Sequence, residues 1–202
     1  MNITLLDGGV GLEVVYRAGD KPPPLFSTQA MIDHPGIVAD VHRDFCAAGS
    51  TIATTNSYAI HHDRLAGTPL EGQFEALYAM AINEAQGSGA TRITGSIGPL
   101  VASYRTDVLP PHEVAVSRFT EVANRLAQDV DLLICETVVS LAHARAVLQA
   151  AAQVTGKPVW IAFSVDDQDG TRLRSGEAFA DAMIVASAAD AVMVDCSSPE
   201  AV

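Results

Sequence analysis

Short apolar runs recur along the chain, and each is followed by a polar or glycine-rich turn and then by a helical pattern. The runs are rich in β-branched residues and too short for buried helices, so they predict strands. They do not alternate polar with apolar positions, which is typical of strands buried on both faces of a parallel sheet. The six runs are residues 3–6, 51–55, 92–95, 131–136, 159–164 and 191–196.

Between the runs, apolar residues recur at the spacing of an amphipathic helix. Three such stripes are Ala115, Phe119, Val122 and Leu126; Leu141, Ala144, Leu148 and Ala151; and Phe179, Met183 and Ala186. Six repeats of strand and helix predict the α/β class, either an open doubly wound sheet or most of a (β/α)8 barrel. The pattern of hydrophobic positions does not separate the two.

Three local signals mark the connections. Residues 156–158, Gly-Lys-Pro, end one helix and start the next strand. Residues 21–24, Lys-Pro-Pro-Pro, predict that the first connection is partly a loop. Residues 198–200, Ser-Pro-Glu, predict a helix start with Ser198 as the N-cap.

Composition narrows the classes of function. The 202 residues carry a formal net charge of −12 and no basic run, which argues against nucleic acid and anionic membrane as partners. No apolar run is long enough to span a bilayer, and we expect no secretory signal at the amino terminus. The three cysteines, Cys46, Cys135 and Cys196, are too few and too far apart for a disulfide framework, so a cytoplasmic location is expected.

Polar side chains follow the carboxyl end of every predicted strand, which is where barrels and open α/β sheets place their sites. Asp7, Gly8 and Gly9 follow the first run, and Asn56 and Tyr58 follow the second. Glu136 follows the fourth run and Cys196 ends the sixth.

Each of these residues also has a purely structural interpretation. Asp7 would cap a turn, and Asn56 and Tyr58 would be turn and packing residues. Glu136 after a strongly apolar run is costly unless it is paired, and a functional and a structural pairing are equally open for it. Cys196 lies beside the predicted helix start, which favours a thiolate and makes it the best placed cysteine to react or bind metal.

The remaining candidates favour structural roles. Cys46 lies in a helical stretch and is predicted to be a small core residue, and Cys135 is predicted to be buried and inert. His61 and His62 fall in a loop region, where solvation is the first interpretation and metal binding the second. The GSIGP segment at 95–99 lacks the Lys-Ser/Thr that a phosphate-binding loop needs.

Taken together, these segments resemble the zinc-dependent homocysteine S-methyltransferase family. LLDGGVGLE (5–13) resembles the family's LLDGGMGTE, and TTNSY (54–58) resembles its TNTY. GSIGP, the Glu-Thr pair at 136–137 and the FSVDD…SGE stretch (163–177) follow in the family order. DCSSPEAV (195–202) resembles the family's NCSSPEAV. The joint order of the motifs, not any single one, carries the resemblance.

The resemblance implies a (β/α)8 TIM-barrel type fold in which residues 1–202 form one domain with about six of the eight βα units. It implies that the chain is truncated at its carboxyl end. The family holds zinc with three cysteines, of which Cys196 is the one present here. The expected Zn²⁺ site is therefore incomplete, because the other two belong to a GGCC motif after the eighth strand.

The resemblance also implies a reaction. Zinc would deprotonate the thiol of homocysteine, which would take a methyl group from a small sulfonium or ammonium donor such as S-methylmethionine or betaine, giving methionine. Asp7 and Glu136 would hold the amino group of homocysteine, and Gly8 and Gly9 would let the backbone approach it. Asn56 and Tyr58 would line the pocket.

Val10, Leu12 and Asp195 depart from the family motifs, and the segment at 103–114 leaves the methyl donor open. Homo-oligomerisation is also left open. Two alternatives remain beside the methyltransferase. One is a non-catalytic remnant of the fold that pairs its open edges with a partner or a second copy. The other is a metal-independent enzyme that uses Asp7 and Glu136 as acid and base.

Overall fold

A computed structural model describes residues 3–19, 25–154 and 156–202 of the protein. The chain divides into two compact units. Unit 1 comprises the chain up to Ser96 together with Asp129–Asp131, and unit 2 comprises Ile97–Gln128 and Leu132–Val202. The predicted loop at residues 21–24 lies outside the described residues. No helix of the described chain is long and apolar enough to cross a membrane.

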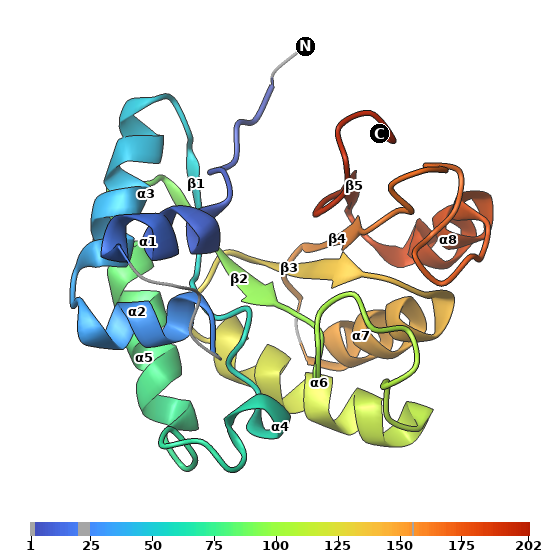
Figure 1. The fold of residues 1–202 in the computed structure, drawn as a ribbon, viewed down its shortest axis with the longest axis horizontal. Coiled ribbons are helices and arrows are strands. Elements are labelled where there is room, and N and C mark those ends of the chain that lie inside the picture. Colours follow the sequence, from blue (N-terminus) through green and yellow to red (C-terminus); the bar gives the residue numbers. More distant parts are fainter. Residues whose placement is uncertain (1–2, 20–24, 155) are drawn as a thin grey trace. The chain divides into compact units, whose positions relative to one another are not determined.

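The described residues of unit 1 form five helices and two parallel strands (Figure 1). The elements are α1 (Val10–Ala18), α2 (Ser27–Asp33), α3 (Ile37–Ala47), β1 (Ile52–Thr54), α4 (His62–Leu65), α5 (Phe74–Gln86) and β2 (Arg92–Ile97). Both strands fall where the apolar runs predict them, with Ile52 opposite Arg92 and Thr54 opposite Thr94.

The prediction of a strand at the first apolar run, residues 3–6, is wrong. Residues 3–6 form no strand, and Leu6 makes only a single parallel bridge to Ile52. Ile3 is 88% exposed and Leu5 is 52% exposed, so the run lacks the two buried faces that a central strand requires. The backbone still pairs with β1, because the amide of Asp7 donates to the carbonyl of Ile52 over 3.2 Å. That pairing fixes the position of Asp7.

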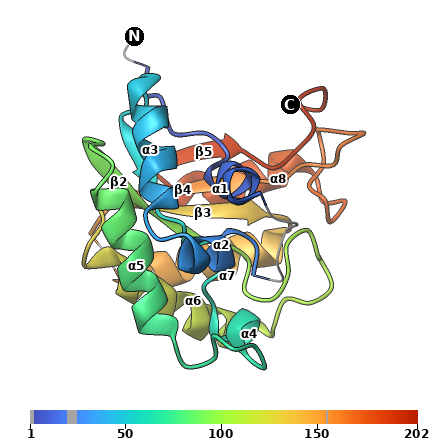
Figure 2. The same ribbon diagram turned by 60° about the vertical axis from the view of Figure 1, so that its left-hand side comes forward.

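Helices α3 and α5 lie next to each other, and a side chain from one caps the other (Figure 2). Glu84 of α5 accepts hydrogen bonds from the amides of Gly36, Val38 and Ala39 at the start of α3, over 3.0, 2.9 and 3.0 Å. The first amides of a helix have no partner within it, and a carboxylate also complements the helix dipole there. Glu84 therefore fixes the start of α3.

In unit 2, the residues that the structure describes form three parallel strands in the order β3-β4-β5. Its elements are α6 (His112–Ala127), β3 (Leu132–Val138), α7 (Leu141–Val154), β4 (Val159–Phe163), α8 (Phe179–Val185), the 3-10 helix η1 (Ala186–Ala188) and β5 (Ala191–Val194). Strands β4 and β5 lie within predicted runs, and β3 overlaps the run at 131–136 but continues to Val138. Helix α7 ends and β4 begins on either side of Gly-Lys-Pro as expected.

Helices α6 and α7 pack against each other and lie on the same side of β3 (Figures 1 and 2). All four residues of the predicted α6 stripe are buried, and three of the four in α7 are. At their contact the rings of Phe119 and His143 stack with centroids 5.5 Å apart. Burial lowers the pKa of His143 to about 4, so this histidine is neutral and serves packing.

The third predicted stripe is only partly right. Met183 is 44% exposed, whereas Ala182 and Ala186 are buried. The buried face of α8 runs through Ala182, three residues after Phe179, and not through Met183, four residues after it. Both spacings suit an α-helix, so the pattern alone does not select between the two positions.

Two aspartates fix strand register at the starts of strands. In unit 1, the amide of Ile93 donates to Asp131 Oδ2 over 2.7 Å. In unit 2, the amide of Val159 donates to Asp190 Oδ2 over 2.8 Å. A buried amide needs a hydrogen-bond partner, and here a side-chain carboxylate is the partner in place of a carbonyl of the neighbouring strand.

Further expectations need correction. Residues 199–201 form a turn, closed by a bond from the amide of Ala201 to the carbonyl of Ser198, and not a helix start. His61 is 1% exposed, not solvated. His62 begins α4, and its ring stacks on Phe74 with centroids 4.3 Å apart. Burial overrides the solvated interpretation for His61, whereas His62 is exposed as expected, although it lies on a helix and not in a loop.

Candidate active site

The candidate residues fall in both units, and each unit presents its own cluster. Asp7, Gly8, Gly9, Asn56 and Tyr58 lie in unit 1. Glu136 and Cys196 lie in unit 2 with residues that the sequence did not single out.

Asp7 is a buried carboxylate held by its neighbours. Its side chain is 3% exposed. Oδ2 accepts a hydrogen bond from the amide of Thr54 over 2.6 Å, and Oδ1 accepts one from the Thr54 hydroxyl over 2.7 Å. His42, fully buried on α3, places Nδ1 3.2 Å from Oδ2, without the alignment of a hydrogen bond. Asp7 is thus oriented by the strand beside it.

The other unit 1 candidates have structural partners. A Cβ at Gly8 would lie 2.7 Å from the ring of Phe45, so this glycine is needed for packing whatever else it does. A Cβ at Gly9 would meet only Leu12, at 3.9 Å. Asn56 is 4% exposed, and its Oδ1 accepts a bond from the hydroxyl of Ser27 over 2.6 Å.

Tyr58 is half-buried and lies under a cation. The guanidinium of Arg64 stands 5.3 Å from the centre of its ring. Burial lowers the pKa of Arg64, while the contact with Tyr58 opposes that change. The pair favours the packing interpretation of Tyr58.

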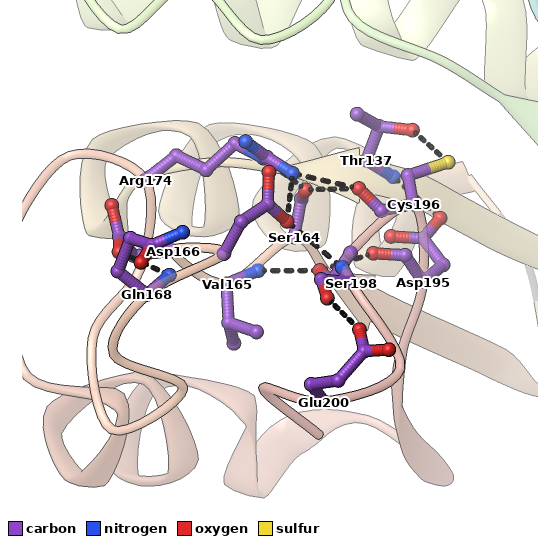
Figure 3. Close-up of polar contacts among 12 residues, drawn as sticks. Thr137, Ser164, Val165, Asp166, Gln168, Arg174, Asp195, Cys196, Ser198 and Glu200 are labelled. Atoms are coloured by element: carbon purple, nitrogen blue, oxygen red, sulfur yellow. Dashed lines mark hydrogen bonds and ion pairs between the residues drawn. The ribbon is translucent and has the colours of Figure 1, made fainter.

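In unit 2, Cys196 is the second residue after the end of β5 and adopts a left-handed conformation with φ 48°. The hydroxyl of Thr137 donates to its Sγ over 3.3 Å (Figure 3). The residue as a whole is exposed, but protein surrounds its sulfur, so burial is the largest influence on the pKa of its thiol. Burial and the charge of Asp195 raise the pKa of the Cys196 thiol, and hydrogen bonds from Thr137 and Tyr104 oppose that rise.

Glu136 lies on β3 next to Thr137, and its charge also raises the pKa of Cys196. Strand β3 is irregular here, because its register against β4 shifts between Cys135 and Val138. Thr137 within that irregularity has φ 53°. A bulge re-aims side chains, which is how this strand presents both residues at its carboxyl end.

Asp195, which the sequence marked as a departure from the family motif, has a structural task. Its Oδ2 accepts a hydrogen bond from the amide of Thr137 over 2.9 Å. Its Oδ1 is buried and has no hydrogen-bond partner among the described residues. Burial therefore raises the pKa of Asp195 to about 6, against the opposing effect of the Thr137 amide.

Sequence reasoning missed Arg174, which joins three parts of this cluster. Its Nε donates to the hydroxyl of Ser164 over 2.7 Å, and its Nη2 donates to the carbonyl of Cys196 over 3.0 Å (Figure 3). Nη2 also pairs with Asp167 over 2.9 Å, and the guanidinium stands 4.9 Å from the ring centre of Tyr104. A lone arginine beside the SGE motif was the only sequence signal.

The other cysteines do not join Cys196. Cys135 is fully buried, which raises the pKa of its thiol to about 12, as the prediction of an inert residue requires. Cys46 lies on α3 in unit 1 as predicted, but it is half-buried and not in the core. Among the described residues, no three His, Cys, Asp or Glu side chains gather in a way that suits a metal ion.

Comparison with known proteins decides the family. The model of the family described as "Homocysteine S-methyltransferase" matches residues 4–202. The chain belongs to the homocysteine S-methyltransferase family. It is 27% identical to Homocysteine S-methyltransferase of Escherichia coli over 86% of this chain, and 24% identical to Homocysteine S-methyltransferase YbgG of Bacillus subtilis over 89% of it. The chain spans 63% of the length of each of these two relatives.

The fold is likewise similar to a solved structure. The homocysteine methyltransferase MmuM of Escherichia coli, in its metallated form, superposes with a TM-score of 0.86 at 23% identity, over 99% of this chain and 76% of that one. Its apo form superposes with a TM-score of 0.75. At this identity the likeness shows the fold alone, and it confirms the α/β fold of TIM-barrel type. Five strands, not six, stand in the described residues, and the single domain over 1–202 stays a prediction.

Proposed function

We propose that the protein transfers a methyl group from a small sulfonium or ammonium compound to the thiol of homocysteine, giving methionine. The observation that carries the proposal is Cys196, an exposed thiol at the carboxyl end of β5, within a chain that matches the family over residues 4–202. The chain spans under two thirds of its curated relatives, so substrates, activity and partners all belong to this proposal.

The chain's own residues suggest how the acceptor would be bound. Asp7 and Glu136 would hold the ammonium group of homocysteine, since two carboxylates against one cation give both orientation and selectivity. Thr54 uses one lone pair on each oxygen of Asp7, and a carboxylate oxygen has a second lone pair to offer. Gly8 and Gly9 would allow close approach, with Asn56 and Tyr58 nearby in unit 1.

The described residues do not by themselves fit a zinc ion. A catalytic zinc needs about three protein ligands, and here Cys196 is the single suitable thiol. We propose Cys196 as one zinc ligand, with the remaining ligands outside the described residues, and derive no chemical step through the metal. We also place the protein in the cytoplasm, a proposal supported by three free thiols.

The test is methionine formation from homocysteine with S-methylmethionine or betaine as donor, in the presence of Zn²⁺. We expect methionine with one of the two donors, and we expect Cys196→Ser to abolish it. Cys46→Ser is the matched control, because it removes a thiol in unit 1 and should leave the rate unchanged. Absence of methionine from folded protein with either donor would overturn the proposal.

The same assay separates the alternatives. Metal-independent acid–base chemistry predicts activity that survives a chelator and is lost in both Asp7→Asn and Glu136→Gln. A remnant that pairs its strand edges predicts no activity and a mass in solution above that of one chain. Size-exclusion chromatography with light scattering measures that mass.

A further inference from the structure

His42 of helix α3 is a buried histidine whose ring nitrogens lack hydrogen bonds. Its side chain is 0% exposed, and neither Nδ1 nor Nε2 has a hydrogen-bond partner among the described residues. An imidazole ring has two polar nitrogens, and burying polar atoms without partners is costly. A histidine left in this state inside unit 1 therefore calls for a role other than packing.

The ring of His42 faces the carboxylate of Asp7. Nδ1 lies 3.2 Å from Oδ2 of Asp7, whose side chain is itself only 3% exposed. That distance suits a hydrogen bond, and only the alignment is lacking. A carboxylate oxygen accepts and does not donate, so a favourable contact requires the proton on Nδ1. Contacts at binding sites are often poorly aligned before the ligand binds and tighten when it does.

The packing of α3 against the segment that carries Asp7 brings the two side chains together. His42 and Phe45 are three residues apart on α3, so they lie on one face of the helix. A Cβ at Gly8 would lie 2.7 Å from the ring of Phe45, so the glycine allows its segment to approach that face. Glu84 binds the first amides of α3 and thereby fixes the helix. Asp7 is thus held between β1 on one side and His42 on the other.

The Asp7 carboxylate keeps one acceptor position for a ligand. An ionised carboxylate has about four such positions, a pair on each oxygen. Oδ2 accepts from the Thr54 amide and faces His42, whereas Oδ1 accepts from the Thr54 hydroxyl alone among the described residues. The position that remains is therefore on Oδ1.

We propose that His42 is a positioning residue, which donates its Nδ1–H to Oδ2 of Asp7 and so presents Oδ1 to the ammonium group of the substrate. This role rests on the proposed function, in which Asp7 holds the ammonium group of homocysteine. It adds which oxygen binds that group and which residue keeps the carboxylate turned toward it. His42 does not touch the substrate, so its effect is confined to ligands that carry an amino group.

The first measurement asks which ring nitrogen of His42 carries the proton. A long-range proton–nitrogen NMR spectrum of protein with isotope-labelled histidine distinguishes the two tautomers, and His42→Asn identifies the signals of this ring. We expect a proton on Nδ1, with signals that move in Asp7→Asn because the charged acceptor is lost. A proton on Nε2 alone, or signals unaffected by Asp7→Asn, would overturn the proposal.

The second measurement compares the dissociation constants of homocysteine and of γ-mercaptobutyrate, which has the thiol and the carboxylate but no amino group. Isothermal titration calorimetry gives both values. His42→Leu should weaken homocysteine binding about tenfold and leave γ-mercaptobutyrate binding unchanged. His42→Asn places an amide N–H near the position of Nδ1 and should bind homocysteine within about threefold of wild type. Equal weakening of both ligands in His42→Leu would overturn the positioning role.

The control is a second buried histidine. His143 also lies on a helix, but in unit 2, where its ring stacks on Phe119. His143→Leu should therefore leave homocysteine binding unchanged. Circular dichroism shows whether each variant folds. If His42→Leu does not fold, His42→Gln takes its place, because its longer side chain carries the amide toward the position of Nε2 and should weaken homocysteine binding in the same way.

The two measurements also separate this role from the proposed function. The NMR spectrum needs neither homocysteine nor a methyl donor. A proton on Nδ1 that responds to Asp7→Asn, in a protein that does not bind homocysteine, would uphold the contact between His42 and Asp7 while the methyltransferase proposal fails. Homocysteine affinity as low in His42→Asn as in His42→Leu would overturn the positioning role and leave the methyltransferase proposal standing.

Discussion

Thr54 holds both oxygens of the Asp7 carboxylate, with its amide 2.6 Å from Oδ2 and its hydroxyl 2.7 Å from Oδ1. The two residues are 47 positions apart in sequence, and the first two candidate motifs of the chain meet in this one contact. Because the carboxylate is buried, its orientation depends on these bonds and not on water.

Thr54→Val removes the hydroxyl donor and leaves a buried charged acceptor with one bond fewer. We expect the free energy of unfolding to fall by about 1–3 kcal/mol, measured by urea denaturation. Thr54→Ser keeps the donor and should lose well under half as much. Equal losses in the two variants would show that the methyl group, not the hydroxyl, matters at this position.

Glu84→Ala removes the carboxylate that binds three amides at the start of α3. We expect a loss of about 1–2 kcal/mol in the free energy of unfolding, together with faster hydrogen exchange at the amides of Val38 and Ala39. Glu84→Gln keeps one acceptor oxygen and loses the charge, so its effect should be intermediate. Unchanged exchange at both amides in Glu84→Ala would contradict the capping role.

Asp195→Asn should change how stability depends on pH. Burial raises the pKa of Asp195 to about 6, above its ordinary value of 3.8, so the folded protein binds a proton there more tightly than the unfolded chain does. The stability from this group is complete below pH ~4 and is lost as pH rises through ~6. The variant's free energy of unfolding relative to wild type should therefore rise by about 2–3 kcal/mol from pH 4 to pH 7.

Urea denaturation of both proteins at several pH values measures that difference and cancels contributions from the other carboxylates. The amide oxygen of asparagine still accepts the bond from Thr137, so the fold is retained. A difference that stays flat between pH 4 and pH 7 would show that Asp195 is not perturbed by its burial.

Arg174 and Arg172 form a matched pair on one loop. Arg174→Met loses bonds to Ser164, Asp167 and the carbonyl of Cys196, and we expect a loss of about 2 kcal/mol in unfolding free energy. Arg172 is 57% exposed at its side chain and binds Asp169 and the carbonyl of Gly176, so Arg172→Met should cost less than about 0.5 kcal/mol. Similar losses of unfolding free energy in both variants would show that the bonds of Arg174 stabilise the fold no more than those of Arg172.

The strands after the first were predictable because β-branched runs buried on both faces leave a clear pattern, as in residues 131–136 and 159–164. The prediction of a strand at the first run failed because a run of four residues, three of them apolar, carries no information about whether neighbours cover it, and Ile3 remains exposed. The stripe through Met183 failed because Ala182 and Met183 both lie at helical spacing from Phe179, and tertiary packing decides which of them is buried.

The site was predictable only at the level of motifs. Cys196 and Glu136 were found because polar residues after apolar strands stand out. Tyr104 and Arg174 were not, because left-handed backbone at a tyrosine and hydrogen bonds across more than twenty residues are set by tertiary packing. Asn56 is the opposite case. Its motif is clear in the sequence, but in the structure its side-chain amide is bound to Ser27.

The aspartates that fix strand register bear on how the acidity of this protein can be altered. The chain carries 24 acidic residues and a net charge of −12, which invites neutralisation of carboxylates in any redesign for altered solubility. Asp131, Asp190 and Glu84 are not interchangeable with acids whose side chains bind only water, because each of these carboxylates is the partner of a backbone amide. Charge engineering should therefore start from exposed acids and leave these three as part of the backbone's own hydrogen-bond network.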